Sequence, residues 1–155
     1  MISTASGEKQ RITALLGVNA DNGLLPIFAI FRGKKVPRNL QTLEASDIYC
    51  NANPTAWMST DMFEDWLKRI WEPYARQFQR TLLVMDKFSV HRKPEILTRL
   101  QSLNTDVIII PAGLTYYIQP CDVYLNGPLK AKMRERWHEH IASQIGAESK
   151  FYLIS

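Results

Sequence analysis

Two aspartates, each placed directly after an apolar run, are the residues of this sequence best suited to chemistry. Asp86 ends the stretch LLVMD, and Asp122 ends the stretch YYIQPCD. Carboxylate oxygens are the ligands that Mg²⁺ prefers, and two such ions about 3.5 to 4 Å apart can stabilise the attacking and the leaving oxygen of a phosphodiester. An acid after a strand is also a common turn residue, and Asp122 also suits the N-cap of a following helix. The pattern leaves both interpretations open, a metal site or two structural residues.

A strand, helix, strand unit is predicted to position these two acids. Residues 80–86 form an apolar run that is too short for a helix and is typical of a buried parallel strand. Residues 94–104 predict a short helix that begins at a proline, and residues 106–112 predict a second buried strand. Ligands gather beyond the carboxyl ends of parallel strands. Because Asp86 lies at such an end and the next loop leads to Asp122, we expect the two acids to converge.

A β-hairpin is predicted nearer the N-terminus. Residues 10–20 and 24–32 are apolar, partly β-branched runs, and the sequence DNG between them favours a tight turn because Asn and Gly tolerate positive φ. Residues 33–58 collect glycine, proline and asparagine, so they predict a long connection with short pieces of strand around residues 48 and 49.

Two amphipathic helices are also predicted. Apolar residues at spacings of three and four predict the first helix, with Ser59, Thr60 or Asp61 as its N-cap, and Pro73 ends or kinks it. Residues 128–143 predict a second helix, in which basic side chains flank an apolar stripe. These cations form either a solvated helix face or a phosphate-contacting surface, and they include Lys130, Lys132, Arg134 and Arg136.

Composition is that of one globular domain with a mild basic excess. The 155 residues are 46% hydrophobic and 22% charged, and 19 Lys and Arg against 15 Asp and Glu give a net charge of +4. Cys50 and Cys121 are far apart and form no CxxC pair, so no zinc site is predicted. With neither a signal peptide nor a long apolar span, we expect reduced thiols in an intracellular protein away from membranes. The four tryptophans are interpreted as core residues: Trp57, Trp66, Trp71 and Trp137.

The order of these segments over residues 8–143 resembles the DDE superfamily endonuclease domain of pogo and Tigger type transposases, the group that includes centromere protein B and jerky. Two motifs carry the resemblance most specifically. One is a strand that ends in Asp86, with His91 five residues on. The other is Gln-Pro-x-Asp after a Gly-Leu-Thr loop, formed by Gly113, Leu114, Thr115, Gln119, Pro120 and Asp122.

The resemblance implies an α/β, RNase H-like fold, a mixed sheet flanked by helices, and cleavage and joining of DNA strands with Mg²⁺ or Mn²⁺ in the nucleus. Asp86 matches the second metal-binding carboxylate of the family, and Asp122 matches the third. His91 then either orients a metal-bound water or phosphate, or holds the backbone of its own loop. Lys87 stands where the family usually has a small polar residue, so its ammonium competes with a cation unless it turns to DNA phosphate.

The sequence departs from the family pattern at its first catalytic aspartate, which lies on a strand before the one that residues 11–20 match. Only residues 1–10 precede that segment in this chain, and they contain no aspartate. Asp21 belongs to the hairpin turn at the opposite sheet end in the family fold, so it is interpreted as a turn residue. We therefore expect a single partial domain over residues 1–155, truncated at the N-terminus and lacking the first central strand.

Loss of that strand predicts two long apolar edges in the middle of the sheet. The chain then pairs these edges directly, borrows a strand from a partner or a second copy, or is poorly stable. Metal binding by Asp86 and Asp122 alone is expected to be weak.

Two functions remain open, and with them the question of whether the chain is an enzyme. One is an impaired, metal-dependent DNA endonuclease, and the other is a non-catalytic DNA- or protein-binding module derived from a transposase. A nucleotide-binding fold is excluded because no glycine-rich loop follows either parallel strand, and a serine or cysteine hydrolase lacks its nucleophile-elbow spacing.

Overall fold

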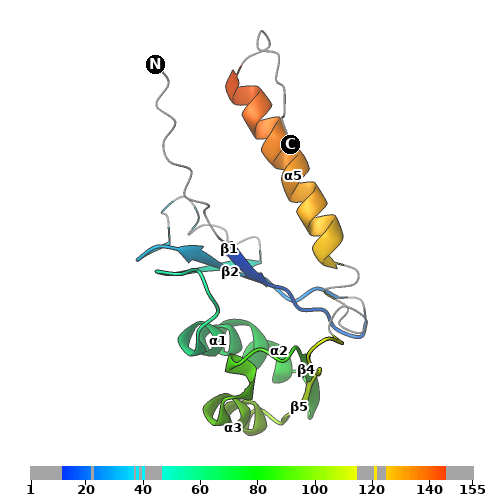
Figure 1. The fold of residues 1–155 in the computed structure, drawn as a ribbon. Helices are drawn as coiled ribbons and strands as arrows, with labels where there is room; N and C mark the ends of the chain where they lie inside the picture. The colour runs from blue at the N-terminus through cyan, green and yellow to red at the C-terminus, as the bar shows by residue number, and fades with distance from the viewer. Residues whose placement is uncertain are drawn as a thin grey trace.

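The computed structural model of the protein describes residues 12–21, 23–36, 38, 40, 47–114, 121 and 125–145. Within them, three strands form one sheet in the order β1-β2-β3, where β1 spans Ile12–Leu15, β2 spans Ile27–Arg32 and β3 spans Ile48–Asn53. β1 is antiparallel to β2, which confirms the predicted hairpin, and β3 is parallel to β2 (Figure 1).

The hairpin connection is organised by the side chain of Asn19. Its Oδ1 accepts hydrogen bonds from the backbone N–H groups of Asp21 at 3.1 Å and Gly23 at 2.6 Å. Because the short amide side chain satisfies backbone donors locally, it stabilises a turn. Asp21 is exposed at this turn, as the sequence predicts.

One interrupted helix packs beneath the first sheet. It comprises α1 (Thr60–Trp66), a π-helical turn η2 (Leu67–Trp71) and α2 (Glu72–Ala75). Ser59, one of the three predicted candidates, caps its start by accepting a hydrogen bond from the Met62 N–H at 3.3 Å. Pro73 lies inside the helix, so of the two effects predicted for this proline, an end or a kink, the structure shows no end but a local distortion. The π-helical turn lies just before Pro73, which has no N–H to donate to the preceding turn of the helix. The helix is therefore distorted locally and then continues.

The predicted strand, helix, strand unit is confirmed, but the prediction that both strands are buried is wrong, because Leu82, Val84 and Ile108 are 55%, 48% and 52% exposed. β4 spans Thr81–Met85, a short 3₁₀ turn η3 spans Val90–Arg92, α3 spans Pro94–Ser102 and β5 spans Thr105–Ile109. β4 and β5 are parallel, with Met85 opposite Ile109 at their carboxyl ends.

β4 and β5 form a second sheet, separate from the first. Among the described residues, β1 is hydrogen-bonded to β2 and β4 is hydrogen-bonded to β5, but β1 and β4 are not hydrogen-bonded to each other. Direct pairing, one of the three outcomes expected for the two apolar edges, is therefore not what this structure shows.

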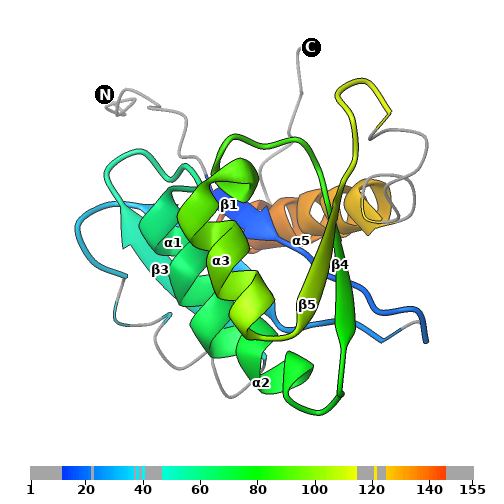
Figure 2. The ribbon, with the colours of Figure 1, turned by 90° about the horizontal axis from the view of Figure 1, so that it is seen from below.

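The core lies between the sheets and the helices α1, α2 and α3. The largest fully buried side chains come from β2, from the interrupted helix and from α3: Phe28, Ile30, Phe63, Leu67, Ile96 and Leu100. The last helix, α5 (Asn126–Ile145), lies on the other face of the β1-β2-β3 sheet from α1 and α3 (Figures 1 and 2). This mixed α/β architecture confirms the predicted fold class. Within the described residues, no helix combines the length and apolar character needed to span a bilayer.

Two tryptophans confirm the expected core role and one does not. Trp66 and Trp71 are buried, whereas Trp57 is 53% exposed because it precedes the capped start of α1 rather than lying on its inward face. Trp71 also joins the helix to the second sheet, because its Nε1–H donates to the Thr105 Oγ1 at 3.1 Å. Trp137 lies outside the described side chains.

The substitution Trp71→Phe should lower the free energy of unfolding by about 1 to 3 kcal/mol, because it removes a buried hydrogen bond and leaves a small void. Trp57→Phe makes the same chemical change at an exposed position and should cost less than about 0.5 kcal/mol. Urea denaturation followed by circular dichroism measures both values. Equal losses in the two variants would contradict the anchoring role of Trp71.

Candidate metal-binding site and adjoining groove

Asp86 lies directly after β4 and is held by His91. The His91 Nδ1 is 2.9 Å from the Asp86 Oδ1 and 3.1 Å from the Asp86 backbone oxygen. The hydrogen bond from His91 is the main reason why the pKa of Asp86 lies below its ordinary value, with burial acting in the opposite direction. The Asp86 side chain remains 41% exposed. The structure therefore presents an ionised carboxylate, fixed in orientation, to solvent at the carboxyl end of a parallel strand.

The imidazole of His91 is packed between aromatic rings. Its centroid is 4.7 Å from that of Phe63 and 5.8 Å from that of Phe88, and the residue is 6% exposed. With Nδ1–H donating to Asp86, a neutral ring has its lone pair on Nε2. That Nε2 is buried without a hydrogen-bond partner among the described residues. In this conformation Nδ1 contacts both the carboxylate and the backbone oxygen of Asp86, and a role toward a metal-bound water or a phosphate stays a prediction.

Asp122 lies outside the described residues, and so do Gln119 and Pro120. The convergence of Asp122 with Asp86 stays a prediction. The adjacent Cys121 is described, and its Sγ lies 3.5 Å from the backbone oxygen of Leu16, just after β1.

A divalent metal requires more ligands than the described residues provide. Mg²⁺ binds oxygen ligands, and Asp86 suits it as one anionic ligand. Among the described residues, however, no group of three or more His, Cys, Asp or Glu side chains could hold a metal ion. The described residues therefore provide one ligand of such a site, Asp86, and do not complete its ligand set.

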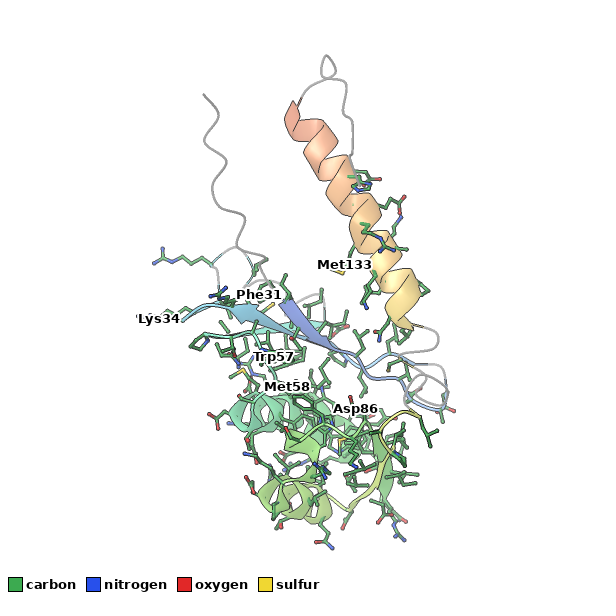
Figure 3. The ribbon with its side chains drawn as sticks, viewed as in Figure 1. Phe31, Lys34, Trp57, Met58, Asp86 and Met133 are labelled. Atoms are coloured by element: carbon green, nitrogen blue, oxygen red, sulfur yellow. The ribbon has the colours of Figure 1, made fainter. Side chains whose placement is uncertain are left out.

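The candidate DNA-contacting cations do not all gather at Asp86. Lys87 is exposed beside it. The other four are exposed on α5, and two of them pair within the helix, Lys132 with Glu135 at 2.6 Å and Arg136 with Glu139 at 3.0 Å. Figure 3 shows Asp86 below the β1-β2-β3 sheet and Met133 of α5 above it. The structure thus brings together Asp86, Lys87 and His91, while Lys130, Lys132, Arg134 and Arg136 belong to a different surface.

A groove of about 820 Å³ extends from Asp86 and His91 between β1 and β4. The residues on its two sides are 13–20 and 80–86, and aromatic side chains of the interrupted helix form its floor. Cys121 also lines it, so the residue next to Asp122 and the carboxylate of Asp86 face the same space. Sequence reasoning predicted the two edges but not the aromatic floor, although the spacing of Phe63, Trp66 and Trp71 already indicated one buried helix face.

A parallel strand pair with an ionised aspartate at its carboxyl end is the arrangement expected of a DDE nuclease domain. The protein-family model described as DDE superfamily endonuclease matches residues 9–153, nearly the whole chain. This chain therefore belongs to the DDE superfamily endonuclease family.

Three relatives place it among the pogo and Tigger group. It is 34% identical over 139 residues to the mouse "Pogo transposable element with KRAB domain", covering 88% of this chain and 22% of that protein. Identity is 28% over 144 residues to the mouse "Tigger transposable element-derived protein 4", covering 92% of this chain and 27% of that one. Identity to the "CENP-B homolog protein 2" of Schizosaccharomyces pombe is 26% over 145 residues, covering 89% of this chain and 28% of that protein.

The matches cover about a quarter of the length of these relatives. No solved structure matches the chain. Family membership and the RNase H-like class of fold are thus established, whereas the activity of this chain has to be argued from its site.

Replacement of Asp86 by asparagine should change the pH dependence of stability. Because folding lowers the pKa of this carboxyl, its ionised form stabilises the protein above the unfolded value of about 3.9, and the contribution is lost as pH falls through the folded value. Since the side chain is partly exposed, we expect a contribution of at most about 1 kcal/mol, or about 2 to 4 °C in Tm.

Thermal unfolding in a chelator-containing buffer would show Asp86→Asn less stable than wild type at pH 7, with the difference vanishing in acid. Asp106→Asn is the control, because the ion pair of Asp106 with Arg80 at 2.6 Å is exposed. A pH-independent difference for Asp86→Asn would show that the effect is steric and not electrostatic.

Proposed function

We propose that this chain is a transposase-derived DDE endonuclease domain that acts on DNA phosphodiesters with Mg²⁺ or Mn²⁺ held by Asp86 and Asp122. The observation that supports this most directly is the ionised Asp86, oriented by His91 at 2.9 Å, at the carboxyl end of the parallel strand β4. Membership of the DDE superfamily endonuclease family supports Asp122 as the other carboxylate of this site and DNA as its substrate.

The residues of the chain have separate tasks in this proposal. Asp86 provides an anionic oxygen, and His91 keeps it in one orientation, so less entropy is lost when the carboxylate binds a cation. A bound divalent ion would stabilise charge on the phosphate and lower the pKa of a bound water. The reaction needs no covalent protein intermediate. Lys87 is exposed beside Asp86, and in this proposal its ammonium contacts a DNA phosphate rather than the cation.

Cleavage by these residues alone should be weak. Asp86 and Asp122 match two of the three carboxylates of the family pattern, and a single carboxylate pair binds Mg²⁺ loosely. The same proposal includes a nuclear location, with DNA as the main partner. It also includes a homo-oligomer, or a partner that contributes a strand.

The alternative is a non-catalytic DNA-binding module, and the exposed cations of α5 favour it. Four basic side chains lie within seven residues of that helix, at positions 130, 132, 134 and 136, and all are exposed. Release of counterions from DNA by such a surface requires no metal.

Metal binding and DNA nicking test the first function. We expect Mn²⁺ to bind weakly by calorimetry, on the order of a millimolar dissociation constant, because few carboxylates are available. Asp86→Ala, and the double variant with Asp122→Ala, should lose both this binding and the nicking of supercoiled DNA. Asp106→Ala is the matched control, because Asp106 is an exposed acid near the start of β5, at the other end of the strands.

Identical binding and nicking by wild type, the double variant and the Asp106→Ala control would refute the metal site. Loss of binding in the double variant without any nicking by wild type would leave a metal-binding domain that is not a nuclease by itself.

The salt dependence of DNA binding tests the second function. Lys130→Ala with Arg134→Ala should reduce the slope of log K against log salt by up to about 2, because each phosphate contact with a duplex contributes about 0.9. Lys132→Ala with Arg136→Ala should reduce it less, since those two cations already pair with Glu135 and Glu139. Fluorescence anisotropy with a labelled duplex gives the slopes, and unchanged slopes in both variants would exclude α5 as the DNA-contacting surface.

A further inference from the structure

An exposed tryptophan lies at the carboxyl end of the parallel pair β2 and β3. Trp57 is 53% exposed, although its two neighbours, Ala56 and Met58, are both buried. Ala56 has a φ of 55°, a left-handed conformation that residues other than glycine rarely adopt. The backbone before α1 thus departs from regular structure where a large aromatic ring is left at the surface, and such strain is often found at functional positions.

Asn53 holds the tryptophan turn, residues 53–58, against the end of β2. Its Nδ2 donates to the backbone oxygen of Trp57 at 2.7 Å, and its Oδ1 accepts from the N–H of Thr55 at 3.1 Å. Its own backbone oxygen accepts a hydrogen bond from the Gly33 N–H at 2.9 Å. One asparagine therefore fixes the position of the tryptophan turn relative to the segment that follows β2.

The segment that follows β2 is basic. Arg32, the last residue of β2, lies opposite Asn53 in the parallel ladder. Figure 3 shows Lys34 beyond the carboxyl end of the strand. The exposed cations of this segment include Arg32, Lys34 and Lys35. Positive charge therefore lies at the strand end to which Asn53 joins the tryptophan turn.

A further cation lies at the start of α1, toward Asp86. The Lys93 Nζ donates to the Thr60 Oγ1 at 2.6 Å, and Thr60 is the first residue of α1. Lys93 comes two residues after His91, which holds the carboxylate of Asp86. The start of α1 thus connects the tryptophan turn with the loop that carries the candidate metal ligand.

Cations outnumber acids in these segments. The exposed acids are Asp61, in the first turn of α1, and Glu95, whose Oε1 is 3.9 Å from the Lys93 Nζ. Among the described residues 32–36, 53–61 and 93–95, four exposed cations stand against these two acids. The surface around Trp57 therefore favours a polyanion.

An exposed aromatic ring among cations suits an unpaired nucleic-acid strand. The phosphates contact the cations while a base stacks on the ring, and this stacking tolerates any base because each one has a π-face. In a duplex the bases stack on one another, so a protein ring gains a base only where the strand is unpaired. Cations alone would bind a duplex equally well, and the ring is what distinguishes the two ligands.

We propose that Trp57, together with Arg32, Lys34, Lys35 and Lys93, binds an unpaired stretch of DNA strand, with one base stacked on the ring and the phosphates on the cations. This inference rests on the proposed nuclease function for the choice of DNA and adds the form in which the DNA is held. The binding itself requires no metal.

A pair of oligonucleotides tests the stacking. One is a labelled thymidine oligomer of about twelve nucleotides, within the usual site size for single strands, and the other carries the same phosphates on abasic sugars. Fluorescence anisotropy in a chelator-containing buffer gives both affinities for wild type and for Trp57→Ala. Phe78→Ala is the matched control, because Phe78 is 51% exposed but precedes β4, at the other end of that strand from Asp86. Circular dichroism checks that the variants fold.

Wild type should bind the thymidine oligomer at least about fivefold more tightly than the abasic one. Trp57→Ala should lose this difference without weakening the abasic oligomer, Trp57→Phe should keep most of it, and Phe78→Ala should keep all of it. Equal binding of the two oligomers by wild type, or no saturable binding of the thymidine oligomer, would overturn the proposal. So would a Trp57→Ala variant that weakens both oligomers equally.

The salt dependence of binding to the thymidine oligomer tests the cations. Lys34→Ala with Lys35→Ala should reduce the slope of log K against log salt by up to about 1.4, because each phosphate contact with a single strand contributes about 0.7. Lys130→Ala with Arg134→Ala on α5 is the comparison and should change this slope less. An equal or larger reduction by the α5 variant would place the strand elsewhere and overturn the proposal.

Two further ligands complete the test. A duplex should bind Trp57→Ala within about twofold of wild type, because its bases are already stacked. A uridine oligomer that binds more than about tenfold more tightly than the thymidine oligomer would make RNA the ligand and overturn the assignment to DNA. Since binding is measured without metal, failure of the nicking assay leaves this result unaffected, and nicking by a protein without the base preference would refute only the present inference.

Discussion

The two sheets of this domain are held together by aromatic packing, and the geometry of the whole site depends on it. Phe63, Trp66, Trp71 and Tyr74 stack in succession along the interrupted helix, with centroid distances of 5.1, 6.0 and 5.6 Å. The first sheet packs on this helix, and the second is fixed to it by the hydrogen bond from Trp71 to Thr105. Because no backbone ladder joins β1 to β4 in the described residues, side-chain packing sets the distance between the sheets.

The same aromatic helix determines how Asp86 is presented. Phe63 packs against His91, and His91 in turn holds the carboxylate of Asp86. A change in the packing of α1 would therefore reach the candidate metal ligand through one ring contact and one hydrogen bond. This dependence gives the buried His91 a positioning role for the carboxylate of Asp86. The cost is an Nε2 with no hydrogen-bond partner in the described part of the chain, and such unsatisfied polar groups are found near functional sites.

The sequence predicted best the elements whose apolar patterns are local and continuous. The run at residues 80–86 predicted a buried parallel strand; β4 is parallel to β5, but one of its faces is open, since Leu82 and Val84 are 55% and 48% exposed. Pro73 does not end its helix, which was one of the two effects predicted for it, because the inward stripe continues past it and packing outweighs one missing hydrogen bond. The exposure of Trp57 depends on the turn before α1, which periodicity does not report. The pairing of Asp86 with Asp122 joins distant segments, and Asp122 lies outside the described residues.

The groove between β1 and β4 has an aromatic floor that includes Trp66 and Trp71. Closing it would require the aromatic floor to move, because Trp66 and Trp71 fill the space beneath both edges.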